Sequence, residues 1–515
     1  MPVISNNKRM AKNTILMYIR MLVLVIVQLY TVPILLRALG IEDYGIYNVV
    51  AGFVAMFTFV NGSLISGCER FMAFEIGSGD DNALKEVFES SLMIFMILAF
   101  VLFVILESFG VWFLNNEMTI PINRLVAANW ILQLSIISMF FTVLATPYNA
   151  AVIAHERMSV YAYASIWGGL FQLIAVCLLV ISPVDKLVFY ASLIALSSIL
   201  QSLFYVIYCR LYFRETKGIR LRVHLKTLKD ISGYASWNVV GSTGIMLRNH
   251  GLNVVMNIFF SPVMNAAHSI AAQISGVLNQ FVTNVYLATR PQMVKQYAKG
   301  NITEMWSLIF KSGKLAFFLL TYILVPVLIE LPSIIRIWLH DVPEYTVVFG
   351  RLMLISLALE TLVNQIIGAF QAANKIKYIQ STSSLILLLV VPLSYFSLLL
   401  SPNPITPYYI YVFISVLYII ILLIIAYLQL NLDVVSYVKE VVIKDLGVLM
   451  PSLLLTYCIV SSVQWGDCRI VLTVFLSLLF TTLLICGIGF DNKERKSISK
   501  IVAQKLCGGK YKPND

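Results

Sequence analysis

Long apolar runs recur along the whole sequence and leave few residues for any other kind of structure. A transmembrane helix needs about 20 mainly apolar residues, and fourteen runs meet that length. They lie approximately at 14–36, 46–67, 88–111, 125–147, 160–182, 187–209, 233–258, 265–289, 315–333, 346–371, 379–400, 406–430, 446–464 and 470–490. The runs are continuous rather than alternating, which excludes a transmembrane β-barrel. We therefore expect an all-α polytopic membrane protein.

The composition excludes a soluble enzyme and a disordered chain. Of the 515 residues, 59% are hydrophobic and 12% are charged, and the mean hydropathy is +0.85. A soluble domain has about 45–50% apolar and about 25% charged residues. The net charge of +11 is typical of basic cytoplasmic loops beside anionic lipids rather than of nucleic-acid binding.

The distribution of Lys and Arg predicts the orientation. With the N-terminus inside, the cytoplasmic segments hold 29 of the 37 Lys and Arg residues and the external loops hold five. Such a split follows the positive-inside rule. We expect a multi-pass protein of the bacterial inner membrane with both termini in the cytoplasm.

A basic linker and two similar turns suggest an internal repeat. Residues 210–230 carry seven Lys and Arg between the sixth and seventh runs. An Arg near the end of the second run in each half, Arg70 and Arg290, is followed about ten residues later by Gly-Asp or Gly-Asn. We expect two parallel six-helix lobes with a substrate site between them. The predicted parts are an N-terminal lobe at 1–209, the linker at 210–230, a C-terminal lobe at 231–430, two further helices at 431–490 and a basic cytoplasmic tail at 491–515.

Motifs for catalysis, nucleotides and metals are missing from the sequence. There is no GxxxxGK[ST], no HExxH and no GxSxG, and the seven cysteines and five histidines are scattered. We expect no cofactor, no metal and no enzymatic activity. A membrane polymerase or ligase would need a large external loop that this sequence lacks, so transport is the function that remains.

Charged and amide side chains inside the runs are the candidate site residues, because a charge at a helix centre costs about 2.5–3.5 kcal/mol on insertion. Arg20 and Arg248 are the deepest, and we favour substrate contact for them. Polar stripes follow three runs. They comprise Asn238, Ser242, Asn249 and Asn253; Ser269, Gln273, Gln280 and Asn284; and Ser356, Glu360, Asn364 and Gln371.

Each candidate has an ordinary alternative. Amide stripes also join helices without binding substrate. Arg70 and Arg290, and also Arg351, could extend to the lipid headgroups. Glu360 is interpreted as the one carboxylate well inside a run, and it could pair with an Arg or exchange a coupling proton.

Three features of the sequence together resemble the polysaccharide-transport flippases. They are the stretch Leu39-Gly40-Ile41-Glu42-Asp43-Tyr44-Gly45-Ile46-Tyr47, the stretch from Arg70-Phe71 to Gly77-Ser78-Gly79-Asp80, and the twelve-plus-two runs. These are the Wzx-type exporters of O-antigen and capsule repeat units, in the superfamily that also holds multidrug MATE exporters and lipid II flippases. Alone, the first stretch could be an ordinary external turn.

This resemblance implies alternating-access transport of an undecaprenyl-diphosphate-linked oligosaccharide. By the resemblance, Arg20, Arg248, Arg70 and Arg290 are predicted to bind the substrate. From the polar stripes, Asn249, Asn253, Gln273 and Gln280 are added as predicted substrate-binding residues, and Glu360 is the predicted ion-coupling residue. The implied partners are this lipid-linked oligosaccharide and membrane lipids, with a polysaccharide polymerase and chain-length proteins as further candidates, and the protein is expected to be a monomer. A MATE-like drug exporter and a lipid II flippase remain alternatives, although a drug cation would favour acidic residues that the first, second, fourth, fifth and sixth runs lack.

Overall fold

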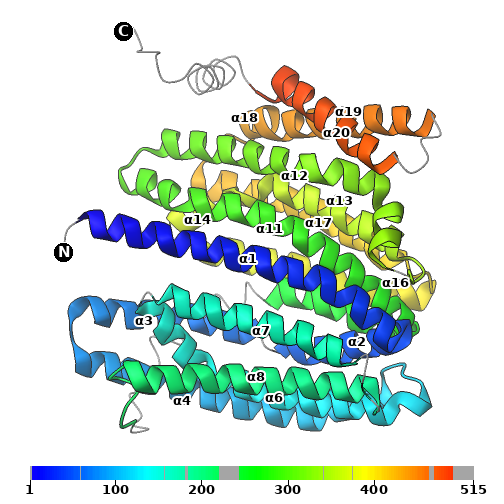
Figure 1. The fold of residues 1–515 in the computed structure, drawn as a ribbon. Coiled ribbons are helices and arrows are strands. Elements are labelled where there is room, and N and C mark those ends of the chain that lie inside the picture. Colours follow the sequence, from blue (N-terminus) through cyan, green and yellow to red (C-terminus); the bar gives the residue numbers. More distant parts are fainter. Residues whose placement is uncertain are drawn as a thin grey trace. The chain divides into compact units, whose positions relative to one another are not determined.

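The structure is a computed structural model that describes residues 3–57, 59–155, 157–179, 182, 184–219, 243–339, 341–373, 375–462 and 469–490. Throughout these ranges the chain forms helices joined by short turns, and no strand occurs in them. Figure 1 shows these helices in order along the chain. The chain divides into two compact units. Unit 1 is Met1–Ala272, Trp338–Phe349 and Gln380–Ile410, and unit 2 is Gln273–Ile337, Gly350–Ile379 and Tyr411–Asp515.

Most helices of unit 1 come from the first half of the chain. They are α1 (Val3–Leu39), α2 (Ile41–Phe57), α3 (Phe59–Ser78), α4 (Asp81–Ile105), η1 (Leu106–Gly110), α5 (Val111–Asn116), η2 (Ile122–Arg124), α6 (Leu125–Ala154), α7 (Met158–Leu179), α8 (Lys186–Tyr212), η3 (Leu247–Gly251), α10 (Leu252–Phe259) and α16 (Val390–Leu400).

Unit 2 contains α14 and the helices of the C-terminal end. They are α14 (Ile366–Ala372), α18 (Val434–Tyr437), η4 (Val438–Val442), α19 (Ile443–Ser462), α20 (Arg469–Leu484) and η6 (Ile485–Gly489). Five long helices contribute residues to both units. They are α11 (Pro262–Ala298), α12 (Ile302–Trp338), α13 (Thr346–Asn364), α15 (Ile376–Leu388) and α17 (Thr406–Leu430).

Within the described residues, eleven helical segments are long and apolar enough to cross a membrane. Each matches one of the fourteen predicted runs, so the prediction of an all-α polytopic membrane protein is confirmed. The other three predicted runs correspond to α2 with α3, to 233–258 and to the relatively polar α11. Part of 233–258 lies outside the described residues, as do the linker from residue 220 and the tail from residue 491.

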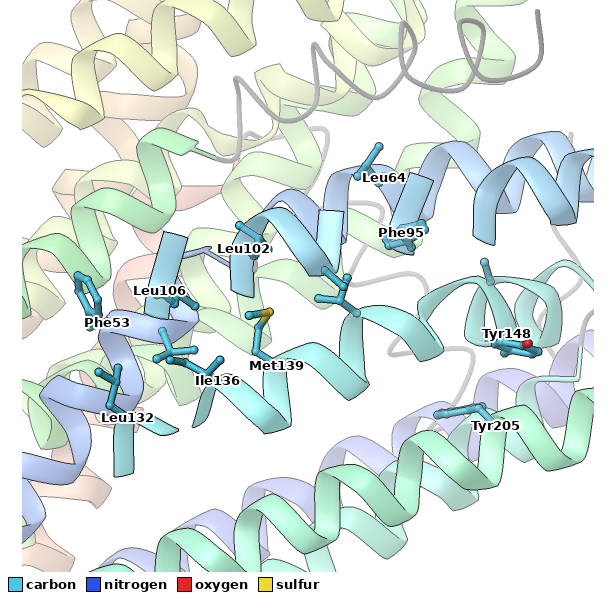
Figure 2. Close-up of a cluster of buried hydrophobic side chains, with 14 of the residues drawn as sticks. Phe53, Leu64, Phe95, Leu102, Leu106, Leu132, Ile136, Met139, Tyr148 and Tyr205 are labelled. Atoms are coloured by element: carbon cyan, nitrogen blue, oxygen red, sulfur yellow. The ribbon is translucent and has the colours of Figure 1, made fainter. Parts of the chain in front are cut away.

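In unit 1, α6 lies at the centre of a helix bundle and packs against α2, α3, α4 and α8, while α1 packs on α7. Figure 2 shows Phe95, Leu102 and Leu106 facing Leu132, Ile136 and Met139 of α6. In a bilayer such contacts gain dispersion energy from close packing rather than from leaving water. Many outward-facing side chains of this unit, such as Phe100, Trp130 and Phe204, are large, apolar and exposed, as expected for helices that face lipid.

Two clusters of charged side chains tie the loops of unit 1 together in the way that the topology predicts. Arg124 binds Asp43 and Asp185, and each of these three residues comes from a different predicted external loop of the first six helices. His155 Nε2 lies 2.6 Å from Glu215 Oε1, and the His155 ring stacks on Phe213. All three residues belong to predicted cytoplasmic segments. Loops that are expected on one side of the membrane therefore meet at one end of the bundle.

The two turns that suggest the repeat share an unusual backbone conformation. Gly79 has φ +78° before α4, and Gly300 has φ +77° before α12. Positive φ values of this kind favour glycine. Asp80 then caps α4, because its side chain accepts hydrogen bonds from the backbone N–H groups of Asn82 and Ala83. The similarity supports the predicted repeat, although the boundaries of the lobes stay a prediction.

Candidate functional site: a polar cavity in the N-terminal bundle

Small polar side chains recur along one face of α6. Ser135, Ser138, Thr142, Thr146 and Asn149 are spaced three or four residues apart. In an α-helix this spacing confines them to about 80° of the helix face and about 21 Å of its length. We call them the α6 stripe. Similar stripes were predicted in three other helices, but this one was not.

The half of the α6 stripe nearer the predicted cytoplasmic end, from Thr142 to Asn149, lines a cavity of about 220 Å³, which we call the inner cavity. Its walls come from α3, α6, α7 and α8, towards the predicted cytoplasmic ends of the last three helices. The lining residues are Asn61, Ile65, Thr142, Ala145, Thr146, Asn149, Tyr161, Ser165, Gln201, Ser202 and Tyr205. Amide and hydroxyl groups therefore dominate a site inside an otherwise apolar bundle.

A second hollow of about 320 Å³ lies along the outer half of the same stripe. It is lined by Ser135, Ser138 and Thr142 of α6 and by residues of α2 and α8, including Tyr47 and Ala191. Asn61 and Thr142 border both hollows. Polar side chains of the α6 stripe therefore border both hollows, while apolar residues make up most of the lining of the second.

Arg20 supplies a positive charge beside the inner cavity. Its guanidinium donates a hydrogen bond to the phenolic oxygen of Tyr161 at 3.4 Å and lies 4.7 Å from the centre of the Tyr161 ring. Arg20 lies on α1 (Val3–Leu39), and its depth in the membrane stays a prediction. None of the described residues that line the two hollows is acidic.

Several polar atoms around the inner cavity have no hydrogen-bond partner among the described residues. They are Arg20 Nε, Asn61 Oδ1, Asn149 Oδ1 and the Tyr205 hydroxyl oxygen. A buried polar atom without a partner costs about 1–3 kcal/mol. Water, or a ligand rich in hydroxyl and phosphate oxygens, would recover this energy here. The cavity is therefore suited to a polar ligand or to water.

The structure places Arg248 and Asn253 in a different part of unit 1. Arg248 is buried in the π-helical turn η3. The Asn253 amide donates to the Asn48 carbonyl oxygen at 3.4 Å and accepts from Asn265 Nδ2 at 2.8 Å. These bonds join α10 to α2 and α11, so Asn253 serves as an interhelical link. Asn249 is exposed, and its carbonyl oxygen lies 3.3 Å from Nε2 of His268.

The remaining predicted site residues lie in unit 2 or outside the described side chains. Gln273 and Gln280 are half-buried on α11, and Oε1 of Gln280 has no partner among the described residues. Glu360 is half-buried on α13 and accepts a hydrogen bond from Ser415 Oγ at 2.9 Å. The side chains of Arg70 and Arg290 lie outside the described ones. The binding and coupling roles of all these residues stay predictions.

Glu360 stays the predicted carboxylate well inside a run, but other helical carboxylates are buried in the protein as well. Glu89, Glu330 and Asp445 are also buried, with exposed fractions of 4%, 1% and 0%. The predicted boundaries placed Glu89 and Glu330 near run ends and Asp445 just outside a run. The helices extend beyond those boundaries, because apolar character marks the membrane core and not the full helix length. In the described part of the chain, no group of three or more His, Cys, Asp or Glu side chains could hold a metal ion.

The described residues form an all-helical, multi-pass bundle with a polar cavity inside it. The chain is similar in structure to the inward-facing conformation of a multidrug resistance MATE family transporter of the MOP superfamily, with a TM-score of 0.66 and 14% identity over 82% of this chain and 98% of that one. It is also similar to the lipid II flippase MurJ in an inward closed conformation, with a TM-score of 0.62 and 12% identity over 96% and 100%. A third similar structure is MATE in complex with MaD3S, with a TM-score of 0.57 and 16% identity over 84% and 96%. The TM-scores establish a shared fold, and identities this low show nothing beyond the fold.

The sequence also matches a family model, described as polysaccharide biosynthesis protein, over residues 10–297. The chain therefore belongs to the polysaccharide biosynthesis protein family, and the resemblance drawn from the sequence is confirmed at the level of family and superfamily fold. No protein of curated function matched the sequence.

Proposed function

We propose that the protein is a flippase for undecaprenyl-diphosphate-linked oligosaccharides. It would move these repeat units from the cytoplasmic to the external face of a bacterial inner membrane, for O-antigen, capsule or exopolysaccharide synthesis. The headgroup needs a polar path, because moving unpaired polar groups through hydrocarbon costs several kcal/mol each. The prenyl tail can stay in lipid. This division of labour needs no covalent chemistry and no cofactor.

The observation that carries the proposal is the polar lining along α6 with Arg20 beside it. Amides, hydroxyls and aromatic rings can bind sugar hydroxyl groups, and a guanidinium can bind a diphosphate through two parallel hydrogen bonds. A drug cation would instead be stabilised by carboxylates, and the described part of the two linings contains none. This speaks against the MATE-like alternative. Membership in a polysaccharide biosynthesis family favours an oligosaccharide over lipid II.

The proposal is tested by export of surface polysaccharide in cells that carry single variants. Arg20→Ala and Asn149→Leu should each reduce export at least about tenfold, which corresponds to about 1.4 kcal/mol, at an unchanged level of membrane protein. Arg37→Ala is the matched control, because Arg37 lies on the same helix and is exposed. Normal export by both Arg20→Ala and Asn149→Leu would contradict the proposal.

The role of Arg248 is tested in the same assay. Arg248→Ala should abolish export without loss of membrane protein if this buried guanidinium contacts the substrate. Arg248→Lys should retain part of the activity if charge alone matters, and little if the planar guanidinium matters. Normal export by Arg248→Ala would remove this residue from the proposed site.

The proposed orientation has both termini in the cytoplasm and Arg124 at the external end. Its support is the positive-inside split together with the meeting of predicted external loops at Arg124 and of predicted cytoplasmic segments at His155. Membrane lipids surround the protein in this proposal. A polymerase and chain-length proteins stay predicted partners, and the monomeric state stays a prediction.

A further inference from the structure

A pocket of about 480 Å³ lies in unit 2, which does not include the α6 stripe. Its walls are the end of α11, the first turns of α12, the residue between α14 and α15, and the turn from α17 to α18. The lining combines the aromatic rings of Tyr297, Trp306 and Phe310 with the charged side chains of Lys375 and Asp433. The pocket therefore offers apolar surface and both signs of charge to one ligand.

The walls of this pocket come from three predicted cytoplasmic segments, which follow the eighth, the tenth and the twelfth predicted runs. Lys375 comes four residues after the tenth run, and Leu430 ends the twelfth. Both residues thus lie at the predicted boundary of the apolar core. Phospholipid headgroups lie at this depth, and Trp and Tyr are enriched there. We therefore expect the pocket to face the headgroup layer of the cytoplasmic leaflet.

Two turns with a left-handed backbone conformation border the pocket. Gly300, with φ +77°, lies between α11 and α12, and Asn431, with φ +52°, lies between α17 and α18. Glycine and asparagine adopt such φ values more readily than other residues do. Short turns at these two places bring the ends of four helices close enough to form one pocket.

The aromatic side of the pocket is held in place by packing. A buried apolar cluster in unit 2 supports Tyr297 and Trp306, and its members are Met293, Met305, Ile309 and Ala369. Both aromatic residues are half-buried and also line the pocket. Each ring is therefore fixed by its neighbours and still accessible to a ligand.

The two charged side chains keep hydrogen-bonding capacity for a ligand. Lys375 Nζ donates to the Gln429 carbonyl oxygen at 2.6 Å, near the end of α17. An ammonium group has three donors, so two remain. Asp433 is exposed and accepts hydrogen bonds from the backbone N–H of Ser436 at 3.1 Å and from Ser436 Oγ at 2.6 Å. A carboxylate can accept about four hydrogen bonds, so it also has sites left.

We propose that this pocket binds the headgroup of a membrane phospholipid that carries both a phosphate and a primary ammonium group, as phosphatidylethanolamine does. Lys375 donates hydrogen bonds to the phosphate, and Asp433 accepts hydrogen bonds from the lipid ammonium group. The Trp306 ring adds a cation–π contact with the same ammonium group. The acyl chains stay in the bilayer. This site goes beyond the proposed transport function and does not rest on it.

Native mass spectrometry of the full-length protein, titrated in detergent with one phospholipid at a time, tests the site. The wild type should bind phosphatidylethanolamine at least about tenfold more tightly than phosphatidylglycerol, which lacks the ammonium group. Lys375→Gln should weaken the binding of both lipids about tenfold, because both lose a charged donor to the phosphate. Lys311→Gln is the control, since Lys311 is exposed on α12. Equal binding by the wild type and Lys375→Gln would overturn the proposal.

Asp433→Asn tests the ammonium contact while keeping the helix cap, because Asp and Asn are equally good at the N-cap position that residue 433 holds before α18. Its affinity for phosphatidylethanolamine should fall to that for phosphatidylglycerol, and its affinity for phosphatidylglycerol should not fall. A preference for phosphatidylethanolamine that persists in this variant would refute the assignment of Asp433.

Soluble phosphoethanolamine distinguishes a lipid from a free phosphate ester. It carries both charged groups but no acyl chains, so at the same concentration it should not displace phosphatidylethanolamine from the wild type. Displacement would show that the pocket takes a free phosphate ester and would contradict the lipid assignment. None of these experiments uses a transport substrate, so failure here would leave the proposed function standing.

Discussion

Gly45 lies directly against the backbone of Pro262. A Cβ atom at position 45 would lie 1.9 Å from the Pro262 carbonyl oxygen and 2.6 Å from its carbonyl carbon. The contact brings α2 against the first turn of α11 inside unit 1. This contact explains why glycine is needed at position 45. Gly40, the other glycine of the stretch from Leu39 to Tyr47, has φ +83° and forms the turn between α1 and α2.

Gly45→Ala is therefore expected to destabilise the folded protein by at least about 3 kcal/mol, the upper end of ordinary overpacking, because backbone atoms cannot yield as a flexible side chain can. The melting temperature in detergent, followed by circular dichroism, measures the effect. Gly276→Ala is the control, since nothing lies within 4 Å of a Cβ atom there, and it should be neutral or slightly stabilising. Equal melting temperatures for the two variants would contradict this reading of the contact.

The sequence predicted the helical class well, because apolar runs of about 20 residues have few other solutions. It did not predict how far α12 continues beyond its run, from Ile302 to Trp338, since the ends of a helix outside the membrane core carry no apolar signal. The α6 stripe was also missed. Serine and threonine residues in a membrane helix are common, and spacing alone does not show which face meets a cavity.

Single charged residues were the hardest to interpret. From the sequence, Arg351 was expected to extend to the lipid headgroups. In the structure it is exposed but donates hydrogen bonds from Nε to the Leu328 carbonyl oxygen at 3.2 Å and from a terminal nitrogen to the Ile329 carbonyl oxygen at 3.5 Å. Pro332 lacks the N–H group that would normally bond to Leu328. The role of Arg351 thus depends on a proline in another helix, which no local pattern reveals.

This dependence predicts a specific double-mutant result. Arg351→Met should lower stability by about 1 kcal/mol, the usual net value of a hydrogen bond, because it leaves the Leu328 carbonyl oxygen without its donor. In a Pro332→Ala background the restored N–H group can serve that oxygen, so the same substitution should have little effect. Thermal unfolding of the four proteins in the cycle measures the coupling. An identical loss in both backgrounds would show that Arg351 acts in some other way.

Arg124 should be important for the integrity of the predicted external end of unit 1. Its guanidinium binds Asp43 through Nε and a terminal nitrogen, and both side chains are largely buried. Arg124→Ala should lower stability by about 1–3 kcal/mol, the range for hydrogen bonds to charged groups. Lys186→Ala, an exposed basic residue at the same end, is the control. Chemical denaturation in detergent provides the measurement, and equal effects of the two variants would contradict the prediction.

Acidification should weaken the same cluster through Asp185. Although burial acts in the opposite sense, hydrogen bonds from Arg124 and from the backbone N–H groups of Val188 and Leu187 lower the pKa of Asp185. A lowered pKa stabilises the fold above the ordinary value of about 3.9. That stability is lost as the pH falls below this value through the pKa of the folded state.

The measurement is the melting temperature between about pH 6 and about pH 3, a window that brackets the ordinary carboxyl pKa. Asp185→Asn should melt at a lower temperature than the wild type at the upper pH and should lose less on acidification. Asp341→Asn, at an exposed site, should follow the wild-type curve. A wild-type slope in Asp185→Asn would mean that this carboxylate does not contribute to the acid sensitivity.

The regular spacing of the α6 stripe has a consequence for how fast and how selectively a cargo could pass. Its side chains are spaced about 4.5–6 Å apart along the helix axis and are chemically alike. A hydroxyl-rich cargo could therefore exchange one hydrogen-bond partner at a time. Each exchange would put at risk about one net hydrogen bond, or about 1 kcal/mol, and the free-energy profile along the helix would stay nearly level. A level profile gives rapid passage but no deep binding well. We therefore expect low affinity for free sugars and broad tolerance of their stereochemistry, with discrimination left to the charged end of the cargo.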